Sequence, residues 1–337
     1  MALTPELHRA PRPQLAQLVR KAEVLVEALP YLRRFQGSTV VIKYGGHAML
    51  SEELRRSVAQ DVVLLKFVGL NPIVVHGGGP EITALMRRVG KEARFVRGLR
   101  QTDAETMELA QMVLVGKINK DVVSLLNQAG GQAVGLSGID GCLLRARRRQ
   151  PPELGFVGDV TGVRTDLLRS LCQSGFIPVV APVGVGEAGE SYNINADAAA
   201  GAVAAALPAQ KLIVLTDVEG IYAQPGDPQS LLATLTPRQA TELLASGAVE
   251  GGMVPKIEAC LTAVAGGVPR AHIVDGRMMH ALLLEIFTDQ GIGTMIAADA
   301  EPQAGGVPDQ VHRAAAGGLA GAGGASAWTP AAEVRRG

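Results

Sequence analysis

Short apolar runs alternate with stretches of helical periodicity along most of this chain. The runs are rich in β-branched residues, and we expect strands over residues 39–44, 73–76, 133–136, 177–181, 211–216, 270–274 and 294–296. The stretches between them predict helices over residues 51–68, 80–89, 165–174, 197–207, 236–246, 254–265 and 279–287. Such an alternation is typical of an α/β fold, and a mostly parallel sheet follows from it.

One more helix is predicted before the first strand. Apolar residues recur at helical spacing between Leu15 and Leu29, and Pro13 and Pro30 bracket the run. The apolar face needs a partner, and the pattern leaves open whether its own domain or a second copy covers it. At the other end, residues 298–337 are rich in Ala, Gly and Pro without periodicity, which predicts a disordered tail.

Two segments interrupt the simple alternation. Residues 102–105, Thr-Asp-Ala-Glu, have the pattern of a capping box and predict a long helix that reaches about Leu126. Residues 142–160 are rich in turn formers and predict hairpins, which we expect to form a rim or lid. A soft boundary between two lobes is expected near residues 181–192.

The composition favours a globular protein with a small-molecule partner. Of its 337 residues 47% are hydrophobic, which is enough for a sizeable core. Lys and Arg together number 32, as do Asp and Glu, so no overall field would hold the protein on nucleic acid or an acidic membrane. The arginines between Arg145 and Arg149 are therefore interpreted as a solvated loop rather than a nucleic-acid patch.

Cysteine usage and hydropathy favour a cytosolic protein. Cys142, Cys172 and Cys260 are scattered without CxxC or ligand-like spacing, which argues against a disulfide framework and a structural zinc site. No run approaches the roughly 18 apolar residues of a membrane span. We expect a protein that is neither secreted nor integral to a membrane.

Two glycine turns are the first candidate chemistry. Residues 43–46, Lys-Tyr-Gly-Gly, and residues 76–80, His-Gly-Gly-Gly-Pro, each follow a predicted strand and precede a helix. Such a turn leaves unpaired N–H groups at a helix N-terminus, where the macrodipole also favours negative charge. Neither turn fits GxxxxGK[ST] or GxGxxG, but a phosphorylated ligand is still expected.

Two lysines beside glycine turns extend this prediction. Lys43 precedes the first turn, and Lys256 follows a glycine pair in the other half of the chain. One such lysine is usually solvated, but two suggest phosphate clamps on opposite sides of a cleft, and Asp197 could hold both ammonium groups in position. Charge stabilisation of this kind is the main requirement of phosphoryl transfer.

No residue has the setting of a strong general base. His76 is the only histidine in a glycine turn, where a structural role is more common. A carboxylate nucleophile is already ionised at pH 7 and needs only alignment. Arg100, just before the predicted long helix, could hold a second carboxylate with a bidentate fork, although a lone arginine there is otherwise a surface residue.

Two further polar positions each allow two interpretations. Asn195 precedes a small-residue helix, so it is either a structural N-cap or part of the site. Asp217 ends a predicted buried strand, where ligands of open α/β sheets tend to bind, but turn chemistry explains it about as well.

Taken together these motifs resemble the amino acid kinase family between about Val40 and Ile296. The lysine with paired glycines, the triple-glycine turn, Gly-Leu-Arg-x-Thr, Asn-x-Asn-Ala-Asp, Thr-Asp-Val and Gly-Met-x-x-Lys occur in the family's order. The resemblance implies a three-layer αβα sandwich over residues 37–297, with a lobe of about 37–190 for the acceptor and one of about 191–297 for ATP. Residues 1–36 would form an N-terminal oligomerisation and regulatory helix.

The resemblance is strongest to members that phosphorylate the side-chain carboxylate of N-acetyl-L-glutamate with MgATP in arginine biosynthesis. It implies that the Mg²⁺ binds with the nucleotide and that the protein has no metal site of its own. The implied catalytic residues are Lys43, Lys256 and Asp197. The implied acceptor-binding residues are Gly78, Gly79, Arg100, Asn193 and Asn195. The implied ATP-binding residues are Gly45, Gly46, Asp217 and Lys256.

A second layer of resemblance concerns regulation. Residues 285–294, together with His272 and the N-terminal helix, resemble the arginine-inhibited members, in which that helix joins dimers into a hexameric ring, a trimer of dimers. Arginine would bind beside Lys211, His272, Glu285 and Gly291, although a helix-end carboxylate on a solvated face also explains Glu285.

Two alternatives stay open. The acceptor N-acetyl-2-aminoadipate is one methylene longer, which is worth only about 1–3 kcal/mol of discrimination. A catalytically silent amino-acid sensor would keep the fold, but the retention of both lysines and Asp197 argues against it. The sequence also leaves open whether a nitrogen-signal regulator binds.

Overall fold

The computed structural model describes residues 12–298 apart from residues 50, 97, 225–226 and 289–290. The tail predicted over residues 298–337 lies outside the described residues from 299 onward. No helix in the described part of the chain is both long and apolar enough to cross a membrane.

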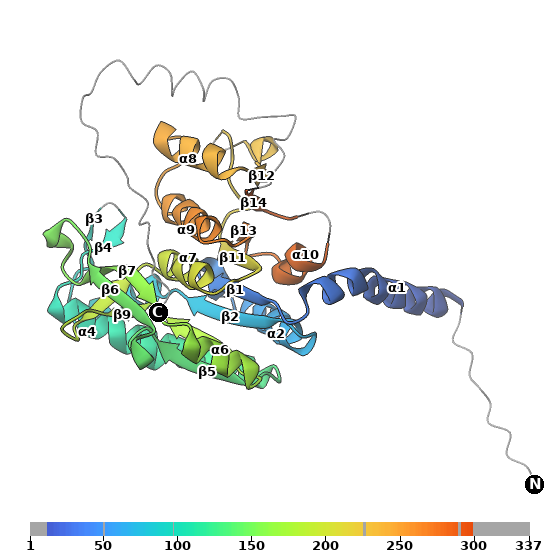
Figure 1. The fold of residues 1–337 in the computed structure, drawn as a ribbon, viewed down its shortest axis with the longest axis horizontal. Coiled ribbons are helices and arrows are strands. Elements are labelled where there is room, and N and C mark those ends of the chain that lie inside the picture. Colours follow the sequence, from blue (N-terminus) through green and yellow to red (C-terminus); the bar gives the residue numbers. More distant parts are fainter. Residues whose placement is uncertain (1–11, 50, 97, 225–226, 289–290, 299–337) are drawn as a thin grey trace, which may run out of the picture.

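One eight-stranded sheet runs through the molecule (Figure 1). Its strands in spatial order are β12 (Thr234–Leu235), β14 (Thr294–Ala297), β13 (Arg270–Asp275), β11 (Lys211–Thr216), β1 (Thr39–Tyr44), β2 (Asn71–His76), β8 (Ile177–Ala181) and β5 (Ala133–Ser137). All neighbours are parallel except the β13–β14 pair. The predicted α/β class with a mostly parallel sheet is confirmed.

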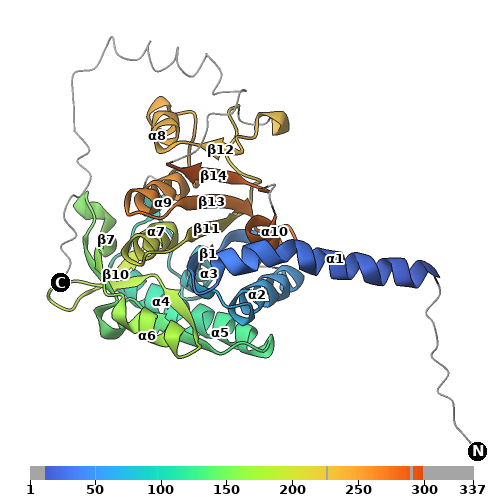
Figure 2. The same cartoon turned by 45° about the vertical axis from the view of Figure 1, so that its right-hand side comes forward.

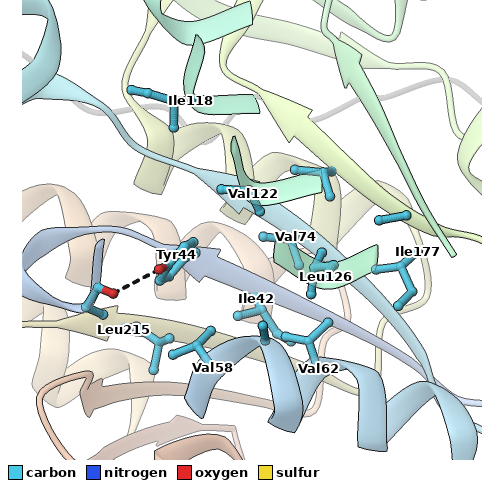
Figure 3. Packing of buried hydrophobic residues seen from close by; sticks show 14 of the residues in the cluster. Ile42, Tyr44, Val58, Val62, Val74, Ile118, Val122, Leu126, Ile177 and Leu215 are labelled. Atoms are coloured by element: carbon cyan, nitrogen blue, oxygen red, sulfur yellow. Dashed lines mark hydrogen bonds between the residues drawn. The ribbon is translucent and has the colours of Figure 1, made fainter. Parts of the chain in front are cut away.

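Helices cover both faces of this sheet, which makes the predicted three layers (Figures 1 and 2). One hydrophobic cluster joins the sheet to α2 (Glu52–Phe67), α3 (Gly79–Arg88), α4 (Ala104–Gln111), α5 (Asn119–Gln128) and α10 (Ala281–Phe287). The other joins it to α6 (Asp166–Gln173), α7 (Ala196–Ala206), α8 (Pro237–Ser246) and α9 (Met253–Ala265). Successive strand residues face opposite layers. Figure 3 shows Val58 and Val62 of α2 beside Ile42 of β1, whereas Val41 packs in the other cluster.

A small closed barrel stands apart from the main sheet. It contains β6 (Leu144–Arg148), β7 (Val157–Val163), β9 (Val183–Val185) and β10 (Ser191–Ile194). The β6–β7 hairpin confirms the turn-rich prediction, but β9 was not predicted. The arginine run was wrongly placed on a loop, because Arg145, Arg147 and Arg148 lie on β6 with their side chains exposed.

The remaining short elements surround this framework. They are the β3 (Phe95–Val96) and β4 (Leu99–Arg100) hairpin and the short helices η1 (Gly46–Met49), η3 (Asp140–Cys142), η4 (Pro152–Leu154) and η5 (Pro228–Ser230). A π-helical segment, η2 (Met112–Ile118), joins α4 to α5 without a break, so the predicted long helix is present but contains a wider turn.

Three predicted helix ends are wrong. The cap of α4 is Asp103, whose carboxylate accepts a hydrogen bond from Thr106 N at 2.8 Å, so the capping box does not form at Thr102. Helix α10 begins at Ala281, since His280 has a φ of 57° and cannot continue a right-handed helix. Helix α1 (Arg12–Phe35) continues through Pro30, which removes only one helical hydrogen bond.

Candidate active site

The two glycine turns meet at the carboxyl ends of β1 and β2. These strands are parallel neighbours, with Tyr44 opposite His76. The backbone N–H of Gly77 donates to Tyr44 O at 2.8 Å, and a Cβ added to Gly77 would lie 3.8 Å from Gly45 Cα. The turns therefore form one continuous backbone surface at the edge where ligands of open α/β sheets bind.

Neighbouring side chains leave no free space for a Cβ at two glycines of these turns. Gly46 has a φ of 67°, and a Cβ there would collide with the carboxylate of Asp217, which follows β11. A Cβ on Gly78 would collide with Leu114 and Ile118 of the π-helical segment. Gly45 and Gly78 are buried, whereas Gly46 and Gly79 are exposed at the start of η1 and α3, where backbone N–H groups have no partner within the helix.

The structure brings the three predicted charged residues together. Lys43 Nζ lies 3.1 Å from Asp197 Oδ1, and Lys256 Nζ lies 3.0 Å from Asp197 Oδ2. The exposed fractions of these side chains are 8%, 7% and 14% for Lys43, Asp197 and Lys256. Burial lowers the pKa of Lys43 against the attraction of Asp197. Burial alone would raise the pKa of Asp197, but the two lysines shift it below its usual value, so it stays ionised.

Local structure fixes Asp197 in this position. Asn195 caps α7, and its Oδ1 accepts from Asp197 N at 2.9 Å and from Ala198 N at 3.1 Å. The capping interpretation of Asn195 is thus correct for its oxygen. Asp197 consequently lies in the first turn of α7, where the helix dipole favours a negative charge.

Arg100 lies on β4 against the first turns of α3. Its Nη2 donates to Gly79 O and to Thr83 Oγ1, both at 2.8 Å, and its Nη1 lies 3.3 Å from Met86 Sδ. The guanidinium also lies 4.8 Å from the centroid of the Phe95 ring. Burial lowers the pKa of Arg100, yet no acidic side chain of the described residues pairs with it. A buried cation without a counter-ion is suited to an anionic ligand.

Thr102 connects Arg100 to Asn193. Asn193 Nδ2 donates to Thr102 Oγ1 at 3.2 Å, and Thr102 Oγ1 donates to Arg100 O at 2.8 Å. Thr102 is fully buried. The sequence pattern assigned this threonine to a helix cap, so its bridging position was missed.

His76 is a neutral, buried structural residue. Its Nδ1 lies 2.8 Å from Gly77 O, an acceptor, so Nδ1 carries the proton and Nε2 accepts from Asn119 Nδ2 at 3.2 Å. Burial lowers the pKa of His76 to about 4. Neither nitrogen is therefore available as a general base. Asn119, which also donates to Val179 O at 2.9 Å, was not recognised in the sequence because a lone helical asparagine gives no signal.

On the β11 side of β1, the edge carries a second group of charges. Thr216 of β11 is opposite Asp275 of β13, and Asp217 follows directly. Arg277 donates to the Asp275 carboxylate through Nε at 2.9 Å and Nη2 at 2.8 Å. Within the described residues, no three His, Cys, Asp or Glu side chains are grouped so that they could hold a metal ion.

The four residues predicted for an effector also lie together, away from the glycine turns. His272 Nδ1 lies 2.6 Å from Glu285 Oε1, and Lys211 Nζ donates to Glu285 O at 3.3 Å. Glu285 Oε2 accepts from Ile292 N at 3.0 Å, and a Cβ on Gly291 would lie 3.3 Å from Glu285 Oε1. Glu285 is buried rather than a solvated helix-end carboxylate.

Burial is the largest influence on the pKa values of Lys211, His272 and Glu285, the charged residues of this predicted effector group. It lowers the pKa of His272, which is therefore neutral, and lowers that of Lys211 to about 8. Burial alone would raise the pKa of Glu285, but His272, the backbone N–H of Ile292 and the charge of Lys211 together outweigh it, so the carboxylate stays ionised.

Helix α1 extends away from the body of the molecule (Figures 1 and 2). Its apolar stripe is exposed, with Leu15 at 55%, Leu18 at 53% and Val26 at 66%. Its own domain does not cover these side chains, which excludes one of the two interpretations of the stripe. At the other end of α1, Phe35 is buried, and its ring centroid lies 5.4 Å from Lys211 Nζ.

Comparisons with known proteins agree with this geometry. Residues 38–275 match the model of the amino acid kinase family. A curated relative, "Acetylglutamate kinase" from Pelotomaculum thermopropionicum, is 57% identical over 287 residues, 82% of this chain and 97% of that protein.

Two solved structures are also similar to this chain. N-acetylglutamate synthase from Neisseria gonorrhoeae, complexed with coenzyme A and N-acetyl-glutamate, has a TM-score of 0.73 and 29% identity, covering 83% of this chain. The same synthase with coenzyme A and L-arginine has a TM-score of 0.70 and 28% identity, again over 83% of this chain. The match spans 64% and 66% of the two synthase chains.

Proposed function

The chain belongs to the amino acid kinase family, and from this premise we propose that it transfers the γ-phosphoryl group of ATP to the side-chain carboxylate of N-acetyl-L-glutamate. The product is N-acetyl-L-glutamyl 5-phosphate. The observation that carries the proposal is Asp197 between Lys43 and Lys256 beside two glycine turns, in which Gly46 and Gly79 are exposed. The name of the relative at 57% identity supports the choice of acceptor.

The positive charges of the site oppose the electrostatic repulsion between the two reactants. Acceptor and donor are both anions, so their approach needs fixed positive charge. Lys43 and Lys256 supply it, and Asp197 keeps both ammonium groups at a fixed separation. The backbone N–H groups of Gly45, Gly46, Gly78 and Gly79 add hydrogen bonds to phosphoryl oxygens.

The acceptor needs no general base, because a carboxylate is ionised at neutral pH. This agrees with a neutral, buried His76. Arg100 and Asn193, linked through Thr102, hold the rest of the acceptor, and Asn195 orients the first turn of α7. We assign the acceptor to the lobe of residues 37–190 together with Asn193.

The nucleotide binds on the β11 side of the edge, in the lobe of residues 191–297. Asp217, which lies beside Gly46, and Lys256 face it there. Mg²⁺ arrives with the nucleotide and neutralises phosphate charge when bound, since such ions are usually held by phosphates with one or two carboxylates.

Arginine is the effector proposed for the group of Lys211, His272, Glu285 and Gly291. The buried, ionised Glu285 is complementary to a guanidinium, and Lys211 connects this group to Phe35 at the base of α1. The exposed stripe of α1 pairs with that of another copy and joins dimers into a hexamer. Such feedback needs a coupling of only about 1–3 kcal/mol between the two sites.

An acyl-phosphate assay tests the function. The protein is incubated with ATP, hydroxylamine and N-acetyl-L-glutamate, N-acetyl-2-aminoadipate or glutamate, each with and without arginine. We expect hydroxamate with N-acetyl-L-glutamate and less of it when arginine is present. Absence of hydroxamate with all three acceptors would refute the kinase proposal.

A further inference from the structure

The guanidinium of Arg100 has three partners on α3, and one of them is a side-chain hydroxyl. An arginine has five N–H donors. Nη2 uses both of its donors on Gly79 O and Thr83 Oγ1, and Nη1 has one near Met86 Sδ. Thr83 Oγ1 is the only side-chain oxygen among these three partners.

The Thr83 hydroxyl both donates and accepts a hydrogen bond. The O–H donates to Gly79 O at 3.1 Å, so its oxygen is free to accept from Arg100. Gly79 is at once the first residue of α3 and the end of the second glycine turn. A short hydrogen-bonded ring thus joins Arg100, Thr83 and Gly79.

We propose that Thr83 is a positioning residue for acceptor binding. Its hydroxyl holds the guanidinium of Arg100 at a fixed position relative to Gly79, in the glycine turn that contacts the phosphoryl group. The inference rests on the proposed function, because it takes Arg100 as the group that binds a carboxylate of the acceptor. A remaining N–H donor of Arg100, held at a fixed place, then binds this carboxylate of the acceptor, while the acceptor's side-chain carboxylate faces the phosphoryl group.

The consequence is a selective loss of acceptor affinity in Thr83→Val. Valine keeps the branched shape but cannot accept the hydrogen bond from Arg100. A hydrogen bond to a charged group corresponds to about a tenfold or larger change in an equilibrium constant. We expect the KM for N-acetyl-L-glutamate to rise about tenfold, with the KM for ATP within about twofold of wild type.

Two variants separate positioning from a structural effect. Thr83→Ser keeps the hydroxyl and should restore the acceptor KM to within about threefold of wild type. Thr262→Val on α9 is the matched control, because Thr262 makes the same backward bond, to Glu258 O at 2.8 Å, without an arginine partner. Its acceptor KM should be unchanged.

Steady-state kinetics on the full chain, with hydroxamate as readout, measure the acceptor KM of each variant and so test the role of Thr83. In an Arg100→Ala background, Thr83→Val should add no further effect, since it acts through Arg100. An acceptor KM for Thr83→Val that stays within twofold of wild type would overturn the inference about Thr83 but not the proposed function. An equal rise of this KM in Thr262→Val would do the same. An inactive wild type would overturn the proposed function as well.

Discussion

Replacing Asp197 by Asn tests the electrostatics of the site most severely. Asparagine has nearly the same shape, so the substitution removes the charge and leaves the packing of α7 in place. In the wild type the side chains of Lys43 and Lys256 are only 8% and 14% exposed, and each ammonium group lies within 3.1 Å of the Asp197 carboxylate. In the variant both ammonium groups remain buried but have lost this carboxylate.

The size of the effect follows from burial. Removing one partner of a buried ion pair costs about 3–5 kcal/mol, because an uncompensated charge remains. The attraction of Asp197 opposes the lowering of the pKa of Lys43 by burial, so this pKa should fall further in the variant. Misplaced or neutral lysines weaken the stabilisation of the phosphoryl group, and we expect kcat to fall by about 10² to 10³.

The assay combines turnover with denaturant unfolding. Asp121→Asn is the control, because Asp121 pairs with Lys117 at 2.7 Å but both side chains are about half exposed, 46% and 63%. Such a pair is worth only about 0.3–0.5 kcal/mol, and turnover should not change. An Asp197→Asn protein with kcat within tenfold of wild type, and as stable as the control, would refute the reasoning.

Three further predictions concern other parts of the chain. Gly46→Ala should raise the KM for ATP at least about tenfold, because its Cβ collides with Asp217, whereas Gly37→Ala, with a φ of 77° but open space around it, should leave this KM unchanged. Burial raises the pKa of Asp61 from 3.8 to about 6, so the stability that it contributes is present below pH 4 and is lost as pH rises through 6. The unfolding free energy of wild type relative to Asp61→Asn should therefore fall by about 3 kcal/mol between pH 4 and pH 7, and parallel pH curves would contradict this. Deleting residues 1–30 should reduce particle size in light scattering and weaken inhibition by arginine; an unchanged particle would rule out α1 as an oligomer contact.

Local signals in the sequence were sufficient for the main sheet. The strands of residues 39–44, 177–181 and 211–216 were predicted with the observed bounds, because strands buried on both faces appear as unbroken apolar runs. Helix ends were less certain. The pattern favoured Thr102 as a cap, but the fold buries this residue between Arg100 and Asn193, and Asp103 replaces it.

The candidate site was predictable where several residue types coincided. Two lysines beside glycine turns and one carboxylate carry enough chemistry for the sequence alone to group Lys43, Lys256 and Asp197. Thr83 and Asn119 were missed, since their roles depend on which distant atoms they meet. The barrel of β6, β7, β9 and β10 was only partly predicted because its pairings join distant short strands.

The central claim is direct transfer of phosphoryl onto a carboxylate, and an oxygen label tests it. N-acetyl-L-glutamate carrying ¹⁸O in both side-chain carboxylate oxygens is incubated with ATP, Mg²⁺ and the wild-type protein, and the product is cleaved with hydroxylamine. Hydroxylamine attacks the acyl carbon, so the bridging oxygen leaves with phosphate. Mass spectrometry should find one ¹⁸O in each phosphate released with hydroxamate; unlabelled phosphate would contradict the account.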